Sequence, residues 1–218
     1  MLRNLILFVV FYLMYSQVAM GLEVGITRDI GEFAVKHGER EIQIIRNQDT
    51  EAMITPGFAR TSRPCPPFCA QPIEVGKGVR TIGEIELVRF MRTRLENGSG
   101  ILVDARTPDW HERGTIPGSI NIPYNQLNAA QGADDLILAE SLARLGVNMR
   151  SEAWDFSKAK TVVLWCNGPW CGQSPTAIKG MLRLGYPAEK IFYYRGGLQL
   201  WLMFGLPVVY PDGRLREE

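Results

Sequence analysis

This 218-residue sequence has almost no net charge and very few histidines. The 24 Lys and Arg residues almost cancel the 23 Asp and Glu residues. No stripe of basic residues is present, which disfavours nucleic acid as a partner. The only two histidines, His37 and His111, share no ligand-like spacing with the cysteines. We therefore expect both histidines at the surface, and we expect neither a metal nor a cofactor.

The first residues have the pattern of an export signal. Arg3 gives a basic start, residues 5–15 carry no charge, and Ala19 and Gly21 are small residues before a cut after position 21. We predict a signal peptide at residues 1–21 and a periplasmic or secreted protein without stable membrane association. The alternative is an uncleaved anchor facing the periplasm, because the apolar run is only slightly shorter than the ~20 residues that span a bilayer.

Cysteine is also rare, and the four cysteines form two close pairs. Cys65 and Cys69 lie in a segment with three prolines, which exclude a regular helix or central strand. We interpret this segment as an irregular strap lying on the main domain. Its pair either closes a small disulfide or exchanges thiols with the second pair, Cys166 and Cys171. A four-cysteine zinc site is disfavoured, because structural zinc usually has two-residue spacings and this chain has three and four.

The length suits one α/β core with a modest appendage. Residues 22–78 form an N-terminal extension, in which residues 41–45 and 52–55 are predicted to pair as a hairpin. Residues 79–210 form the main domain, with alternating strands and helices, and residues 211–218 form a short tail.

The main domain is predicted as an open parallel sheet flanked by helices, an α/β fold. Residues 81–84 fit a capping box that begins a helix. Thr161–Trp165 has no polar alternation, which indicates a central parallel strand covered on both faces. The other expected strands are 101–104, 191–194 and 206–209, and the other expected helices lie around 138–145, 174–184 and 198–204.

Cys166 is the first residue after this apolar strand, where ligands of open parallel sheets gather. The next helix is predicted to begin with Ser174 as its cap and Pro175 in its first turn. Loop amides and the helix dipole lower a thiol pKa, and they also stabilise a persulfide or an oxyanion. We therefore predict a reactive Cys166 thiolate within reach of solvent, and not a buried structural cysteine. The predicted active-site loop comprises Asn167, Gly168, Pro169, Trp170, Cys171, Gly172, Gln173 and Ser174.

Several spaced motifs together resemble the rhodanese family over about residues 79–210. They are Asp104-Ala105-Arg106, Ile116-Pro117-Gly118, Val163 to Cys166, Ser174, Gly185-Tyr186, Gly196-Gly197 and Trp201. The resemblance implies the rhodanese α/β fold and sulfurtransferase activity, with Cys166 as the sulfur-accepting residue. It also implies that Asp104 and Arg106 organise the floor beneath the loop, and we expect them to form a partly buried ion pair.

The loop departs from the usual single-domain rhodanese in two ways. It is two residues longer, and Gln173 stands where an arginine is expected, which disfavours tight binding of thiosulfate. Arg195, after the neighbouring strand, either reaches the pocket or lies at its rim. Cys171 either resolves a Cys166 persulfide by thiol exchange or forms a static disulfide that stiffens the loop.

Three functions fit these residues. The first is sulfur transfer, in which a small sulfur compound or a protein persulfide charges Cys166 and a thiol acceptor removes the sulfur. The second is thiol-disulfide or oxyanion redox chemistry by Cys166 and Cys171. The third is a non-catalytic binding module that docks a partner through a surface around Trp165 and Trp170, since a fold does not guarantee an activity.

Overall fold

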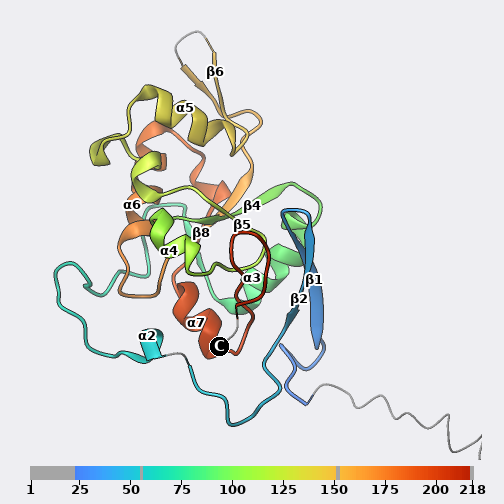
Figure 1. Cartoon of the computed structure of the whole chain (residues 1–218). Coiled ribbons are helices and arrows are strands. Elements are labelled where there is room, and N and C mark those ends of the chain that lie inside the picture. The colour runs from blue at the N-terminus through green and yellow to red at the C-terminus, as the bar shows by residue number, and fades with distance from the viewer. Residues whose placement is uncertain (1–22, 55, 151–152, 217–218) are drawn as a thin grey trace, which may run out of the picture.

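The computed structural model describes residues 23–54, 56–150 and 153–216 (Figure 1). The predicted signal peptide lies outside the described residues. Within the described part of the chain, no helix has the length and apolar character needed to cross a membrane.

A five-stranded parallel sheet forms the centre of the main domain. Its strand order is β3-β9-β8-β4-β5, so β8 lies in the middle, as its unbroken apolar sequence predicts. The paired strands all run in the same direction. Their bounds are β3 Arg80–Ile82, β4 Gly100–Asp104, β5 Ser119–Asn121, β8 Thr161–Trp165 and β9 Ile191–Tyr194.

Helices cover both faces of this sheet (Figure 1). On one face lie α3 (Glu84–Phe90), its π-helical continuation Met91–Leu95 and α7 (Gly197–Met203). Their buried side chains join one core cluster with those of alternate strand residues. On the other face, α5 (Asp135–Ala143) and α6 (Gln173–Leu184) contribute to a second cluster. The predicted α/β fold, an open parallel sheet flanked by helices, is therefore confirmed.

The hairpin of the extension differs from the predicted one. Its strands are β1 (Glu32–His37) and β2 (Arg40–Ile45), whereas residues 52–54 are not in a strand. Gly38 occupies the tight turn with φ +58°, a conformation that favours glycine. The buried side chains Val35, Ile42 and Ile44 extend the core cluster on the α3 side. The strand prediction was therefore right for β2 and wrong about its partner.

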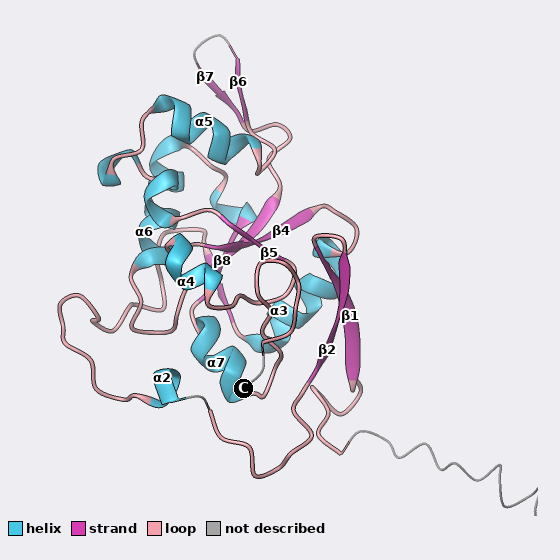
Figure 2. Cartoon of the chain, in the orientation of Figure 1, coloured by secondary structure: helices cyan, strands magenta, loops and turns pink. Residues whose placement is uncertain are grey.

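The predicted strap, residues 63–69, lies in a longer irregular segment, residues 60–78, which is called the strap below. It follows the short helix α2 (Pro56–Ala59) and is drawn as loop along the outside of the domain (Figure 2). Cys65 and Cys69 form a disulfide in it. Of the two predicted alternatives for this pair, a small disulfide or thiol exchange with the second pair, this structure contains the disulfide.

Two predicted helix starts are wrong in detail. Thr81 belongs to β3, and its hydroxyl donates to the Ile73 carbonyl of the strap. The helix α3 instead starts after Gly83, whose amide donates to the Glu86 carboxylate at 3.1 Å. Ser174 lies inside the first turn of α6, after Gly172 as cap, so its hydroxyl is available for another partner.

Sequence patterns also missed several short elements. Both β3 and β5 were absent from the prediction, as was the short helix α4 (Pro108–Glu112). A two-stranded ribbon, β6 (Asn148–Arg150) with β7 (Ala153–Asp155), projects beyond α5 (Figure 2). Each strand of this ribbon has three residues, too few to show a periodic pattern.

Candidate active site

Cys166 directly follows β8, at the carboxyl edge of the sheet. Its carbonyl accepts the Leu198 amide at 2.9 Å, and the next carbonyl, of Asn167, accepts the Gln199 amide at 3.0 Å. Gly197 allows this approach, because a Cβ there would lie 2.1 Å from the Cys166 carbonyl oxygen. The start of α7 thus fixes the backbone of the cysteine.

Several donors surround the Cys166 sulfur. The Ser174 hydroxyl donates to it at 3.1 Å, whereas the Cys166 thiol itself donates to the Cys171 carbonyl at 3.2 Å. Burial, the largest effect, would raise the pKa of Cys166, but hydrogen bonds from the Cys171 thiol, the Ser174 hydroxyl and the amides of Ser174 and Gly168 together lower it. Ser174 therefore acts on the sulfur and not as the predicted helix cap.

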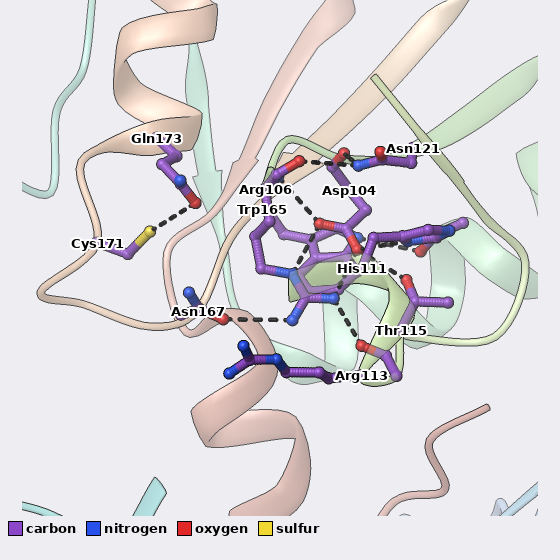
Figure 3. A network of polar contacts seen from close by, with 12 residues as sticks. Asp104, Arg106, His111, Arg113, Thr115, Asn121, Trp165, Asn167, Cys171 and Gln173 are labelled. Atoms are coloured by element: carbon purple, nitrogen blue, oxygen red, sulfur yellow. Dashed lines mark hydrogen bonds and ion pairs between the residues drawn. The ribbon is translucent and has the colours of Figure 1, made fainter. Parts of the chain in front are cut away.

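Cys171 has the opposite electrostatic balance. Burial and the negative charge of Cys166 raise its pKa well above the usual thiol value. Its sulfur lies 3.7 Å from the Gln173 side-chain oxygen (Figure 3). Both Cys166 and Cys171 are free thiols in this structure. The pair therefore consists of one thiol whose pKa is lowered and one whose pKa is raised.

A buried polar network lies beneath the loop (Figure 3). Asp104 is fully buried, and its carboxylate accepts hydrogen bonds from the Arg106 guanidinium at 2.6 and 2.8 Å, from the Thr115 hydroxyl at 3.0 Å and shares one with His111 at 2.9 Å. Burial would raise the pKa of Asp104, but Arg106 and His111 hold it at about 2. The expected ion pair is thus fully buried and not partly buried.

Arg106 connects this network to the loop. Its guanidinium donates to the Asn167 side chain at 3.3 Å and lies 4.7 Å from the centre of the Trp165 ring. Trp165 is fully buried and donates to Ser119 at 3.1 Å. Trp165 therefore cannot contribute to the predicted docking surface. The network instead supports the residue next to Cys166.

Neither histidine lies at the surface as expected. His37 is 6% exposed, and its ring accepts the Gly118 amide at 3.1 Å. His111 is half-buried against Asp104, because α4 turns it back toward the end of β4. Sequence analysis missed His111 as a site residue, although it lies only seven positions after Asp104. Among the residues that the structure describes, no cluster of three or more metal-ligating side chains is present.

A family model for the rhodanese-like domain matches residues 89–203, more than half of the chain. The chain belongs to the rhodanese-like domain family. A sulfurtransferase of Allochromatium vinosum is 23% identical over 61% of this chain and 99% of its own. An HTH-type transcriptional regulator of Mycobacterium tuberculosis is 28% identical over 62% of this chain. The chain spans about half the length of that regulator, since the match covers 46% of it.

Solved structures of similar fold include single-domain sulfurtransferases. The human single-domain sulfurtransferase TSTD1 shares 25% identity over 57% of this chain and 96% of its own, with a TM-score of 0.39. The single-domain sulfurtransferase RDL2 of Saccharomyces cerevisiae shares 22% identity over 59% and 93% of the two chains, with a TM-score of 0.42.

The loop of this rhodanese-like domain, residues 167–174, contains no arginine. Gln173 occupies the start of α6 beside the cysteine pair. Arg195 donates both its Nε and Nη2 to the Gln71 carbonyl of the strap, at 3.1 and 2.8 Å. Arg195 therefore binds the strap. The prediction that its side chain reaches the pocket is not the arrangement seen in this structure.

The strap closes over the rhodanese-like loop. The Arg63 guanidinium lies 3.8 Å from the centre of the Trp170 ring, and the Phe68 ring meets the same indole edge-on at 5.5 Å. The Gln71 amide donates to the Pro169 carbonyl at 2.8 Å. Trp170 itself donates to Gln199 at 2.7 Å. Trp170 is thus held between the strap and α7 and is only partly exposed.

Cys166 is only 2% exposed beneath this closure, and Cys171 is 5% exposed. The expectation that solvent reaches the Cys166 sulfur is therefore wrong for this structure. The strap, which precedes the loop by about a hundred residues, packs on Trp170 and Pro169 of that loop, and these contacts leave no mark in the residue spacing around the cysteine.

A cavity of about 380 Å³ adjoins the closed loop. Cys171 lines it and Cys166 does not. Among the described residues that line it, none is charged; they are Pro67, Phe68, Trp110, Tyr124, Gln131, Asn167, Trp170, Cys171, Gly172, Gln173 and Thr176. The cavity thus offers aromatic surface and amide groups to a ligand, with no fixed charge to bind an anion.

Proposed function

We propose that this protein is a sulfurtransferase in which Cys166 accepts sulfur as a persulfide. The proposal depends on one observation above all. Donors from Ser174, Gly168 and Cys171 lower the pKa of Cys166 although the residue is buried. A buried cysteine of purely structural function has no need of such donors, and its pKa would be raised.

The proposed reaction is an exchange between sulfur atoms. The Cys166 thiolate attacks the outer sulfur of a persulfide R–S–SH, the S–S bond of the donor breaks, and R–S⁻ leaves. Cys166 then carries –S–SH. A thiol acceptor attacks that outer sulfur and regenerates the thiolate. The other exit uses Cys171. Its thiol attacks the Cys166 sulfur while the thiol proton passes to the leaving outer sulfur, so H₂S is released and a Cys166–Cys171 disulfide remains.

The donor is proposed to be a persulfide of a small organic thiol or of a protein. Thiosulfate is a dianion, and a guanidinium would bind it through two hydrogen bonds. Gln173 supplies no such charge, and Arg195 is engaged by the strap. The adjoining cavity is lined by uncharged side chains. These features favour the persulfide of an organic thiol or of a protein over a small oxyanion.

Sulfur transfer requires the strap to move, because the Cys166 sulfur is closed off. The contacts that hold the strap on the loop involve side chains of Arg63 and Phe68 and one amide of Gln71. Each is a single local interaction. The closed form therefore protects the cysteine, and a partly displaced strap exposes it.

We also propose that the protein is exported, on the pattern of residues 1–21. The Cys65–Cys69 disulfide supports this location, because disulfides persist mainly in oxidising compartments. Protein isolated from the exported fraction is expected to begin at Leu22. A retained Met1 would instead indicate the membrane-anchored alternative.

The test of sulfur transfer is mass spectrometry after exposure to a cysteine persulfide, with thiosulfate in parallel. The wild-type Cys166 peptide is expected to gain one sulfur from the persulfide. Cys166→Ser is expected to lose this gain and all transfer, whereas Cys171→Ser still loads but changes the turnover or the product. Cys65→Ser with Cys69→Ser is the matched control and retains loading. Full transfer by Cys166→Ser would end the proposal.

A second candidate is thiol-disulfide redox chemistry by the loop pair. It is favoured by two free thiols in hydrogen-bonding contact whose pKa values are shifted in opposite directions. Equilibration of the protein with thiol buffers of set potential measures whether the pair cycles between dithiol and disulfide. A pair that stays reduced at every physiological potential would rule this candidate out.

A further inference from the structure

Tyr193 carries a buried hydroxyl without a hydrogen-bond partner among the described residues. The side chain lies in β9 and is fully buried. Two other buried tyrosines of the domain are satisfied: Tyr186 donates to the Lys160 carbonyl at 2.6 Å, and Tyr194 donates to the Glu84 carboxylate at 3.0 Å. An unpaired buried hydroxyl is unfavourable and needs a physical explanation.

The position of Tyr193 places it beside the cysteine pair. In the parallel pairing of β8 and β9, Tyr193 is opposite Leu164, and both side chains belong to the core cluster on the α6 face. Successive side chains of a strand alternate, so Cys166, two residues after Leu164, lies on the same face. Diagonal neighbours at this spacing are within the reach of an aromatic side chain.

Electrostatics shows the same proximity. Burial raises the pKa of Tyr193 well above its usual value, and negative charge on Cys166 raises it further, as does charge on Cys171. The phenol therefore keeps its proton throughout the physiological range. It is a permanent donor on the strand next to β8, close enough to feel the charge of both cysteines, and it has no hydrogen-bond partner among the described residues in the protein without a persulfide.

Loading with sulfur would supply the missing acceptor. The Cys166 sulfur already has its donors from Ser174 and the loop amides. A persulfide adds a second sulfur about 2 Å beyond the first, and after ionisation the negative charge resides largely on this outer atom. That atom needs a donor of its own.

We propose that the Tyr193 hydroxyl donates a hydrogen bond to the outer sulfur of a persulfide on Cys166. This inference rests on the proposed sulfur transfer. It adds that Tyr193 binds the transferred sulfur atom while Cys166 carries it. Loading follows the balanced exchange given above, and the perthiol then loses its proton to solvent while Tyr193 keeps its own. The hydroxyl is thus unsatisfied in the empty state and satisfied in the loaded state, which favours retention of the sulfur.

The test compares Tyr193→Phe with two matched variants, Tyr186→Phe and Tyr194→Phe. All proteins are loaded with a cysteine persulfide, and the rate of perthiolate alkylation is measured against pH by mass spectrometry. Tyr193→Phe is expected to load but to raise the pKa of the perthiol by about one unit, a tenfold loss of the ionised form below that pKa. The two matched variants leave the midpoint unchanged.

The same variants separate this effect from a structural one. In the sulfur-free state, Tyr193→Phe removes an unpaired group and is expected to keep or increase the melting temperature, whereas Tyr186→Phe leaves a buried carbonyl unpaired and lowers it. An unchanged perthiol midpoint in Tyr193→Phe would overturn the assignment while sulfur transfer stands. Failure of the wild-type Cys166 to gain sulfur overturns both.

A measurement on the wild-type protein covers the case in which Tyr193→Phe does not fold. Tyrosine labelled with carbon-13 at Cζ reports the hydrogen bond of each phenol by NMR. Loading is expected to move one buried signal, while the signals assigned through Tyr186→Phe and Tyr194→Phe stay in place. A spectrum in which loading moves no buried signal would reject the proposal.

Discussion

The two cysteine pairs of this chain have similar spacing and opposite physical settings. Cys65 and Cys69 lie in the strap, and they are joined by a disulfide. Cys166 and Cys171 are buried free thiols at the carboxyl edge of the sheet. The difference comes from the surroundings, because only the second pair has a hydroxyl, backbone amides and a helix start directed at one sulfur.

The two pairs are also connected through the contacts between the strap and the loop. The strap that contains the disulfide carries Arg63 and Phe68 onto Trp170, and its Gln71 amide binds the loop backbone. The segment that contains the disulfide therefore packs on the loop that contains Cys171, and we infer that it limits access to Cys166. Changes to the strap should alter the exposure of Cys166, whereas changes beneath the loop should alter the fold that supports it.

The largest expected effect comes from Asp104→Ala. This change removes the buried carboxylate beneath the Cys166 loop and does not touch the disulfide of the strap. The change leaves the buried Arg106 charge without its carboxylate and is expected to lower the free energy of unfolding by about 3–5 kcal/mol. Urea denaturation measures the loss. Asp212→Ala, which breaks an exposed ion pair with Arg214, is the control and should not change the midpoint measurably. A loss equal to that of the control would show that the network does not hold the site.

The second effect concerns the strap. Arg63→Ala combined with Phe68→Ala removes a cation–π contact and an edge-on aromatic contact with Trp170. Such contacts contribute about 1–3 kcal/mol together, so iodoacetamide should modify Cys166 about ten- to a hundredfold faster. Ile73→Ala, at an exposed side chain of the same strap, serves as the control. Equal modification rates in the double variant and the wild type would show that the strap does not limit access.

Sequence reasoning located the cysteine because its signals are local. The apolar run of β8 makes it the central strand, and Cys166 necessarily follows at the carboxyl edge. Sequence patterns predicted the wrong partner strand for the hairpin. The actual turn contains Gly38, and the alternating residues Ile42 and Ile44 lie on its buried face. The polar residues at 47–49 were a competing turn signal of the same kind.

Interactions between distant segments were beyond the reach of the pattern. Ser174 fits a helix cap by its position, but a sulfur eight residues earlier takes its hydroxyl. His111 joins Asp104 only because α4 turns back toward β4. Arg195 takes its partner from the strap, 124 positions away. Each of these contacts depends on tertiary packing, which residue spacing does not encode.

The smallest effect tests the donors that distinguish the reactive pair. Ser174→Ala removes a hydroxyl that donates to the Cys166 sulfur and so favours the thiolate. Because that hydrogen bond lowers the pKa of Cys166, its loss should raise the pKa by about one unit, and the thiolate fraction below the midpoint should fall about tenfold. The rate of Cys166 alkylation against pH measures the shift, with Ser141→Ala, a buried serine of α5, as the control. The disulfide of the strap should be unaffected in both variants. If the alkylation midpoint of Ser174→Ala coincides with that of Ser141→Ala, the hydroxyl does not stabilise the thiolate, and the contrast between the two pairs then depends on the backbone amides and the Cys171 thiol alone.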